Sequence, residues 1–409
     1  MTRIWTLHNY RLLFSSSAIS NLGDGVSAVA FPWLATLITR DPILIAMVAF
    51  TTRLPWLLFS IPAGVWTDRL DRRRMMVQAD LVRLALTFGV VGVILSAPEF
   101  PPAREGFYIA VISVLAFLLG SAEVIRDNAA QTVLPAVVPK ERLEQANGQI
   151  WSVEQVMGAF VGPPLAGFLI AYAVPAPFVL DAVTFGVAAL LVWAMTIAPR
   201  DPAPRKSWLA EAKEGIAWML QHRVILQLAV MLGLLNACNV MALTMLTLFS
   251  QEVFGLNAWQ YGMLISVEAA GGVIGGLICP AVAARLRRRG SLMLALPLIG
   301  FGWGIVGMTS SVWVAGPALF AGMFAGLLWN VVTVSYRQRL IPDELLGRVN
   351  SLYRFFGWGM IPIGALAGGW IVALAEPDLG RELALRLPFL LSAIGIGLIW
   401  IYAALRLKI

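Results

Sequence analysis

Acidic side chains stand deep inside long apolar runs of this chain, where they could take up and release protons. Asp24 lies about twelve residues into one such run, and Glu268 lies at a similar depth in another. A charge at the centre of a membrane helix costs roughly 2.5–3.5 kcal/mol, so it is retained where it faces a cavity or a partner. We predict proton coupling at both acids. The alternatives are a structural hydrogen bond for Asp24 and an ion pair with Arg53 for Glu268.

Three further charges lie on one helix face near the end of the apolar run at 107–129. Glu123 precedes Arg126 by three residues and Asp127 by four, and residues at these spacings are neighbours on a helix. Glu123 is therefore a third candidate for proton coupling. In another run Arg83 follows Asp80 by three residues, which predicts that local pairing satisfies this arginine.

Polar and aromatic residues in the apolar runs could line a cavity. Asn21 shares a helix face with Asp24, and Arg53, at mid-depth, needs a carboxylate or an anionic ligand. An amphipathic ligand could stack on the aromatic residues, although tryptophan also serves as an anchor at membrane interfaces. The cavity candidates are Asn21, Arg53, Trp329, Asn330, Phe355 and Trp358.

Composition places the chain in a membrane. It is 59% hydrophobic and 13% charged, whereas soluble domains carry about 25% charged residues. The net charge of +7 comes from arginines in short turns between apolar runs, so positive-inside topology explains it better than nucleic-acid binding. Cys238 and Cys279 lie within apolar runs and predict neither a disulfide nor a metal site. With no phosphate-binding motif or nucleophile constellation, an enzyme is the least favoured class, and we expect no cofactor.

Twelve runs are long enough to cross a bilayer, which takes about 20 residues. Of the 30 Lys and Arg residues, 22 fall on one side of this topology, four on the other and four within spans. This asymmetry predicts that both termini are cytoplasmic, in the inner or plasma membrane. The predicted spans are 12–39, 43–65, 75–97, 107–129, 147–173, 177–198, 223–254, 258–283, 291–310, 313–335, 348–375 and 384–405.

An internal repeat divides the chain into halves. PKERLEQAN at 139–147 recurs as PDELLGRVN at 342–350, and a Pro/Gly cluster follows each copy. Because six spans per half is an even number, the halves are parallel repeats. We predict an all-α polytopic protein with domains at 1–199 and 223–409. Between them, 200–222 forms a cytoplasmic linker with an amphipathic helix on the membrane surface.

The loop IPAGVWTDRLDRRR at 61–74 joins two antiparallel spans and resembles the signature loop of the major facilitator superfamily. Twelve spans in two parallel halves fit the same resemblance. It implies a cytoplasmic gate held by a charge network between this loop and the span at 107–129, in which we expect Arg72 to pair with Asp127 and Glu123 with Arg126. A static lock is the alternative role. The gate residues are Gly64, Asp68, Arg69, Arg72, Arg73, Arg126 and Asp127.

The segment GAFVGPPLAG at 158–167 is similar to the antiporter signature of the superfamily, which accompanies proton-coupled efflux. The stretch at 20–34 resembles the branch with macrolide and enterobactin exporters. The signature residues are Gly158, Gly162, Pro163 and Gly167.

These resemblances imply a proton-coupled secondary exporter of a small amphipathic compound, of the drug or siderophore class, working by alternating access. We expect a monomer that contacts membrane lipid and a small-molecule substrate, with no nucleic acid. A lysophospholipid flippase of the same fold and a non-transporting membrane receptor are the alternatives.

Overall fold

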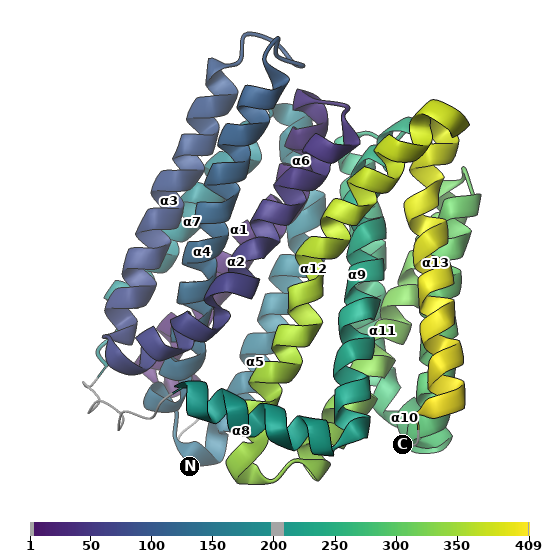
Figure 1. Cartoon of the computed structure of the whole chain (residues 1–409). Helices are drawn as coiled ribbons and strands as arrows, with labels where there is room; N and C mark the ends of the chain where they lie inside the picture. The colour runs from purple at the N-terminus through teal and green to yellow at the C-terminus, as the bar shows by residue number, and fades with distance from the viewer. Residues whose placement is uncertain (1–3, 198–207, 408) are drawn as a thin grey trace. The chain divides into compact units, whose positions relative to one another are not determined.

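The computed structural model describes residues 4–197, 208–407 and 409, in which every regular element is a helix (Figure 1). These residues form two compact units. Of the described residues, unit 1 contains 4–40, 51–197 and 257–266, and unit 2 contains 41–50, 208–256, 267–407 and 409. The first residues of α2 therefore belong to unit 2, and the first residues of α10 belong to unit 1. The predicted domain boundaries stay a prediction.

The helices follow the predicted spans closely. Those that begin before residue 200 are η1 (Ile4–Thr6), α1 (His8–Ile38), α2 (Pro42–Arg69), α3 (Arg72–Ser96), α4 (Glu105–Val137), η2 (Lys140–Arg142), α5 (Leu143–Glu154), η3 (Gln155–Val161), α6 (Gly162–Tyr172) and α7 (Ala176–Trp193). The later ones are α8 (Trp208–Gln221), α9 (Arg223–Glu252), α10 (Ala258–Met308), α11 (Val312–Leu340), α12 (Asp343–Leu379) and α13 (Arg381–Arg406).

Ten helices in the described residues are long and apolar enough to cross a membrane. One of them, α10, has 51 residues and covers the predicted span at 258–283 and nearly all of that at 291–310, with a kink between them where Arg287 has a φ of 56°. The helix α1 is not among the ten, because Asn21, Asp24 and several serines lower its hydropathy. The protein is thus a multi-pass membrane protein, and the count of twelve spans stays a prediction.

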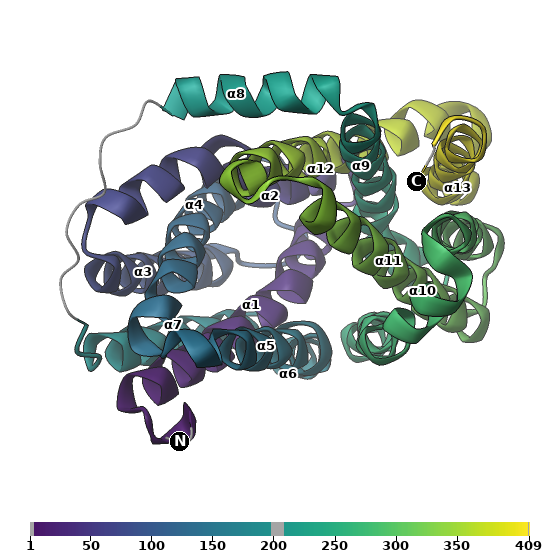
Figure 2. The ribbon, with the colours of Figure 1, turned by 90° about the horizontal axis from the view of Figure 1, so that it is seen from below.

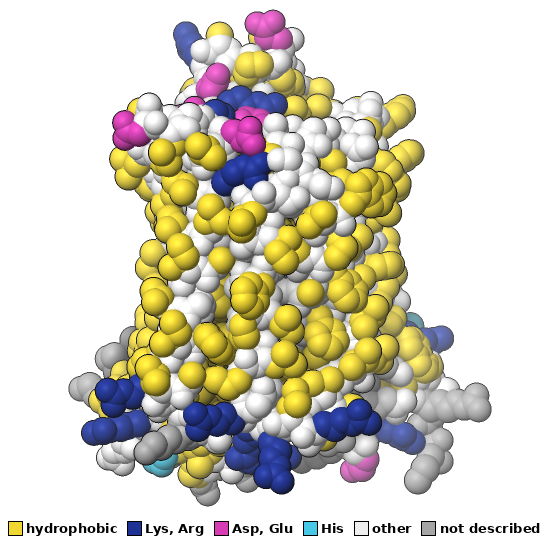
Figure 3. All heavy atoms as spheres, turned by 90° about the vertical axis from the view of Figure 1, so that its right-hand side faces the viewer, with side chains coloured by type: hydrophobic (Ala, Val, Ile, Leu, Met, Phe, Trp, Pro, Cys, Tyr) yellow, Lys and Arg dark blue, Asp and Glu magenta, His cyan; other side chains and the backbone are white. Residues whose placement is uncertain are grey.

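The surface of unit 2 matches a membrane environment. On the face that lies to the right in Figure 1, hydrophobic side chains cover the middle and Lys and Arg gather at the lower end (Figure 3). At the opposite end of this unit, Arg381 pairs with Glu252 and Glu376, both at 2.9 Å, and Arg386 pairs with Glu382 at 2.8 Å. Basic side chains therefore predominate at one end of this face.

The helix α8 lies crosswise to α9 and contacts α9 and α12 within unit 2 (Figures 1 and 2). The sequence predicts a helix here, following a polar linker whose residues 200–207 lie outside the described part. At its end the Trp218 ring stacks on His222 at 3.7 Å between ring centroids.

The predicted span at 147–173 contains a π-helical turn, η3, directly before two prolines. Gly162 donates its N–H to the Met157 carbonyl five residues back, as in a π-helix. Pro164 has no N–H for the Phe160 carbonyl four residues before it. Ser266, at the start of α10, donates its hydroxyl to this carbonyl at 3.2 Å instead. The prolines thus create a backbone acceptor that a second helix of unit 1 satisfies.

Glycines let the backbones of α1 and the η3–α6 segment touch. A Cβ at Gly25 would overlap the Gly158 carbonyl, and a Cβ at Gly162 would overlap the backbone of Gly25. Unit 2 repeats this arrangement where α9 packs along α12. There a Cβ at Gly364 would overlap the Ala237 backbone. The Pro/Gly cluster of each repeat therefore lies at a close crossing with the first long helix of its half.

We predict that Gly25→Ala and Gly162→Ala each destabilise the protein by about 1–3 kcal/mol, because the added methyl group has only backbone to displace. Gly148→Ala is the matched control, since a Cβ at this helical position meets nothing within 4 Å. It should stabilise by about 0.5–1 kcal/mol, because alanine is the better helix former. Apparent melting temperatures of the detergent-purified variants test this. Equal values for Gly162→Ala and Gly148→Ala would contradict the close crossing.

Candidate functional site

Polar side chains on one face of α1 hold the buried charges of unit 1. Successive members are four, four and three residues apart, which keeps them on one face of the helix. In unit 1, α1 contacts α4, α5, α6 and α7 and lies between them (Figure 2). This face is therefore turned toward other helices. The residues of this α1 stripe are Ser16, Ser20, Asp24 and Ser27.

Arg83 of α3 is buried against the middle of the α1 stripe. Its guanidinium forms an ion pair with Asp24, donates to the Ser20 hydroxyl at 3.3 Å and lies 3.8 Å from Asp80. The guanidinium carbon also lies 3.8 Å from the centroid of the Phe185 ring. A buried cation needs partners to replace lost water, and two carboxylates and a ring supply them. The predicted local pair with Asp80 is present, and Asp24 of α1 is a second and closer partner.

Arg126 of α4 lies beside Ser16, one turn of α1 before Ser20. It donates to the Ser16 hydroxyl at 3.2 Å, and its Nε lies 3.5 Å from Asp80. Its other guanidinium nitrogen lies 3.7 Å from Asp127. Asp80 is thus shared between two buried arginines of two helices. The expected pair between Asp127 and Arg72 is replaced by this local pair, because Arg126 is the nearer cation.

Asp181 of α7 accepts a hydrogen bond from the last residue of the α1 stripe, Ser27. Ser27 donates its hydroxyl to one oxygen of Asp181, whose side chain is buried. The second oxygen has no hydrogen-bond partner among the described residues. Gly23 allows this approach, since a Cβ there would overlap Asp181 and Thr184. This carboxyl group therefore has one hydroxyl partner and no ion pair in the described part of the chain.

Glu123 completes the group of charges. It interacts electrostatically with Arg83 and Arg53 and with two of the acids named above. Its expected ion pair with Arg126 is absent among the described residues, and Arg53 is exposed. We call this group the charge cluster. Its members are Asp24, Asp80, Arg83, Glu123, Arg126, Asp127 and Asp181.

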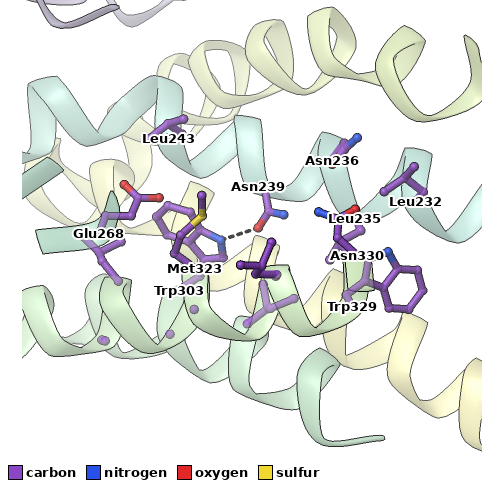
Figure 4. A pocket seen from close by; sticks show the side chains of 17 residues that line it. Leu232, Leu235, Asn236, Asn239, Leu243, Glu268, Trp303, Met323, Trp329 and Asn330 are labelled. Carbon is purple, nitrogen blue, oxygen red and sulfur yellow. Dashed lines mark hydrogen bonds between the residues drawn. The ribbon is translucent and has the colours of Figure 1, made fainter. Parts of the chain in front are cut away.

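Unit 2 contains a pocket of about 250 Å³ among α9, α10 and α11 (Figure 4). Three residues that the sequence singles out, Glu268, Trp329 and Asn330, line it. The other two candidates of this unit are not in its lining. Phe355 is exposed and packs edge-on against Phe356 at 6.1 Å, and Trp358 lies nearby on the same helix.

The family model for the Major Facilitator Superfamily matches residues 13–365. The chain belongs to the major facilitator superfamily. Its helical architecture is the fold of that superfamily, and the protein is a transporter and not an enzyme.

Relatives share most of its length at low identity. The multidrug efflux pump Tap of Mycobacterium tuberculosis is 25% identical, covering 94% of this chain and 91% of that protein. Macrolide efflux protein A of Streptococcus pyogenes is 24% identical over 88% of each chain. The solved structure of a bacterial homologue of the iron transporter ferroportin, in its inward-facing state, has a TM-score of 0.75 at 17% identity. It covers 99% of this chain and 100% of that one, and this likeness concerns the fold alone.

The signature loop of the superfamily joins α2 to α3. Arg72 donates to the Thr67 carbonyl at 3.1 Å and to the Thr132 carbonyl of α4 at 2.8 Å. Arg73 donates to the Trp193 carbonyl at the end of α7. The loop is thus tied to α4 and α7 through backbone carbonyls of unit 1. Three gate residues lie at positions whose surroundings the structure does not describe: Gly64, Asp68 and Arg69.

The sequence reasoning missed two parts of the charge cluster. Asp181 is an acid inside the apolar run at 177–198, and the rule that marks Asp24 would have found it. The serines of the α1 stripe were not recognised as partners, although Ser16, Ser20 and Asp24 recur at helical spacing. Asn21, expected to line a cavity, donates its amide to the Ser17 carbonyl at 2.9 Å within α1.

We predict that Arg83→Met destabilises the protein by about 3–5 kcal/mol, because it leaves buried carboxylates without their counter-charge. The double variant Asp24→Asn with Arg83→Met should recover part of this loss, since Asp80 keeps Arg126 as its partner. Arg74→Met is the control, because its pair with Asp71 is exposed and should matter little. Apparent melting temperatures give the comparison. A double variant no more stable than Arg83→Met would contradict the pairing of Arg83 with Asp24.

Proposed function

We propose that the protein is a proton-coupled secondary exporter of a small amphipathic compound, working by alternating access. It uses the proton gradient and no cofactor. It acts as a monomer in the cell membrane, with both termini in the cytoplasm. The efflux activity named for its Tap and macrolide relatives supports export, and the charge cluster supports proton coupling.

One observation carries the proposal: Asp24 is accessible on one side and bonded to a buried arginine on the other. The Asp24 side chain is 29% exposed, whereas that of Arg83 is 3% exposed. A proton that reaches Asp24 would cancel its charge and weaken its pair with Arg83. Arg83 would keep Ser20 and Asp80 as partners, so protonation would weaken the ion pair between α1 and α3 without leaving the arginine unpaired.

The balance of charge in the cluster points the same way. Five carboxyl groups face two buried arginines, and Glu123 also interacts electrostatically with Arg53. Unbalanced charge is costly where water is excluded. Uptake of protons lowers the excess negative charge of the cluster, and loss of protons restores it. Such a cluster can therefore alternate between two protonation states and bias two conformations.

The pocket of unit 2 supports an amphipathic substrate. Leucines and tryptophans supply apolar walls, and the amides of Asn236, Asn239 and Asn330 supply hydrogen-bonding groups. Pockets of this mixed kind hold small molecules that have both polar and apolar parts.

We predict that Asp24→Asn abolishes concentrative transport driven by a pH gradient while it leaves substrate binding intact. The amide has the size of the acid but cannot exchange a proton. Purified protein in liposomes with an imposed pH gradient gives the measurement, with siderophores, macrolides and lysolipids as the trial compounds. Glu99→Gln, an exposed acid between α3 and α4, is the control and should transport as the wild type does.

Two results would contradict the proposal. Accumulation by Asp24→Asn equal to that of the wild type would remove Asp24 from the coupling step. Transport of a lysolipid that does not depend on the pH gradient would favour the flippase function instead.

A further inference from the structure

Glu268 stands apart from the other acids of unit 2. It lies on α10 and lines the pocket, and it has neither a hydrogen bond nor an ion pair with any described residue. Glu252, Glu376 and Glu382, in contrast, pair with arginines at the end of the unit. A carboxylate in an apolar span is costly without a partner. Glu268 therefore needs a partner that the described residues of the pocket do not supply.

Nothing in the lining of the pocket can neutralise this carboxylate. The described lining residues include no Lys, Arg or His, and Glu268 is the only charged one. A bound anion would face an acid with no cation to hold it. The pocket is therefore complementary to a positive charge.

The amides of the pocket add acceptors for a cation. Asn236 donates its Nδ2 to the Gly357 carbonyl at 2.8 Å, so its Oδ1 remains free to accept. Trp303 donates its Nε1 to Asn239 at 2.7 Å, which fixes both side chains in the wall (Figure 4). With Nε1 bonded to Asn239, Trp303 contributes its indole ring to the lining of the pocket, and indole rings attract cations.

The remaining walls select an organic cation over a metal ion. Magnesium and calcium require six or more oxygen ligands, whereas this pocket offers one carboxylate and a few amides among Leu243, Met323 and two tryptophans. Its volume of about 250 Å³ lies below the range of about 300–1,000 Å³ that holds drug-sized ligands. The geometry suits a small ammonium group that carries an apolar or aromatic body.

We propose that this pocket binds a small organic cation, a protonated or quaternary amine with an apolar or aromatic group, and that Glu268 is its counter-ion. The inference rests on the proposed function and names its substrate class. Because a proton on Glu268 would remove the charge that holds the amine, proton and amine compete for this carboxylate. No other titratable group lines the described pocket. The competition therefore takes place at one atom pair, the oxygens of Glu268.

Binding of phenyltrimethylammonium to the purified full-length protein, measured by titration calorimetry, tests this. The wild type should bind this cation, and benzenesulfonate, of similar size and opposite charge, should not bind. Glu268→Gln should weaken binding by about tenfold or more, the size of one charge-assisted contact. Glu268→Asp, which keeps the charge, should bind better than Glu268→Gln. Glu154→Gln, an acid within a span of unit 1, is the matched control and should bind as the wild type does.

Lowering the pH should weaken cation binding by the wild type and leave residual binding by Glu268→Gln unchanged. Equal affinity of the wild type and Glu268→Gln, or preference for benzenesulfonate, would overturn the inference. Displacement of the amine by magnesium at equal concentration would also overturn it. If Glu268→Gln fails to fold, binding of the two probes to the wild type still shows whether the pocket prefers a cation or an anion. Gradient-driven export of a neutral or anionic compound, with no binding of the amine, would refute this inference and leave the proposed function standing.

Discussion

The structure of unit 1 depends on keeping Arg83 charged where water cannot reach it. A guanidinium cannot lose its proton in a protein, so the surrounding helices must supply its counter-charges. Asp24 comes from α1 and Asp80 from α3 itself, and the Phe185 ring from α7 covers the cation. Asp80 in turn lies 3.5 Å from Arg126 of α4. One buried cation thus requires side chains from several helices to meet, which sets how α1 faces its neighbours.

Much of this arrangement follows from sequence. Apolar runs and basic turns predict the membrane helices, and Asp24 and Glu268 stand out because acids are rare in such runs. Pairing across helices could not be predicted, because it depends on the rotation of each helix about its axis. Arg83 has Asp80 on its own helix, yet Asp24 on another is closer. In the same way, Asp127 pairs with Arg126 and not with Arg72, the partner that we expected. The role of the serines of the α1 stripe depends on partners from α3, α4 and α7, which the sequence of α1 does not indicate.

The two intramembrane sites differ in how their charges are balanced. In unit 1, carboxylates and arginines from different helices neutralise one another in part, and Asp24 remains accessible. In unit 2, Glu268 lies in a pocket without a cation among the described lining residues. The first arrangement suits a proton that changes the pairing inside a bundle. The second suits a charge that arrives with a ligand. Our proposal therefore places proton coupling chiefly at Asp24 and recognition of charge at Glu268.

The central claim is that Asp24 itself takes up and releases a proton while Arg83 stays charged. Infrared difference spectra of the protein in lipid, recorded between alkaline and acidic pH, test this most directly because a protonated carboxyl group has its own absorption band. We expect this band to appear on acidification in the wild type and to be diminished in Asp24→Asn. Identical difference spectra for the two proteins would contradict the account.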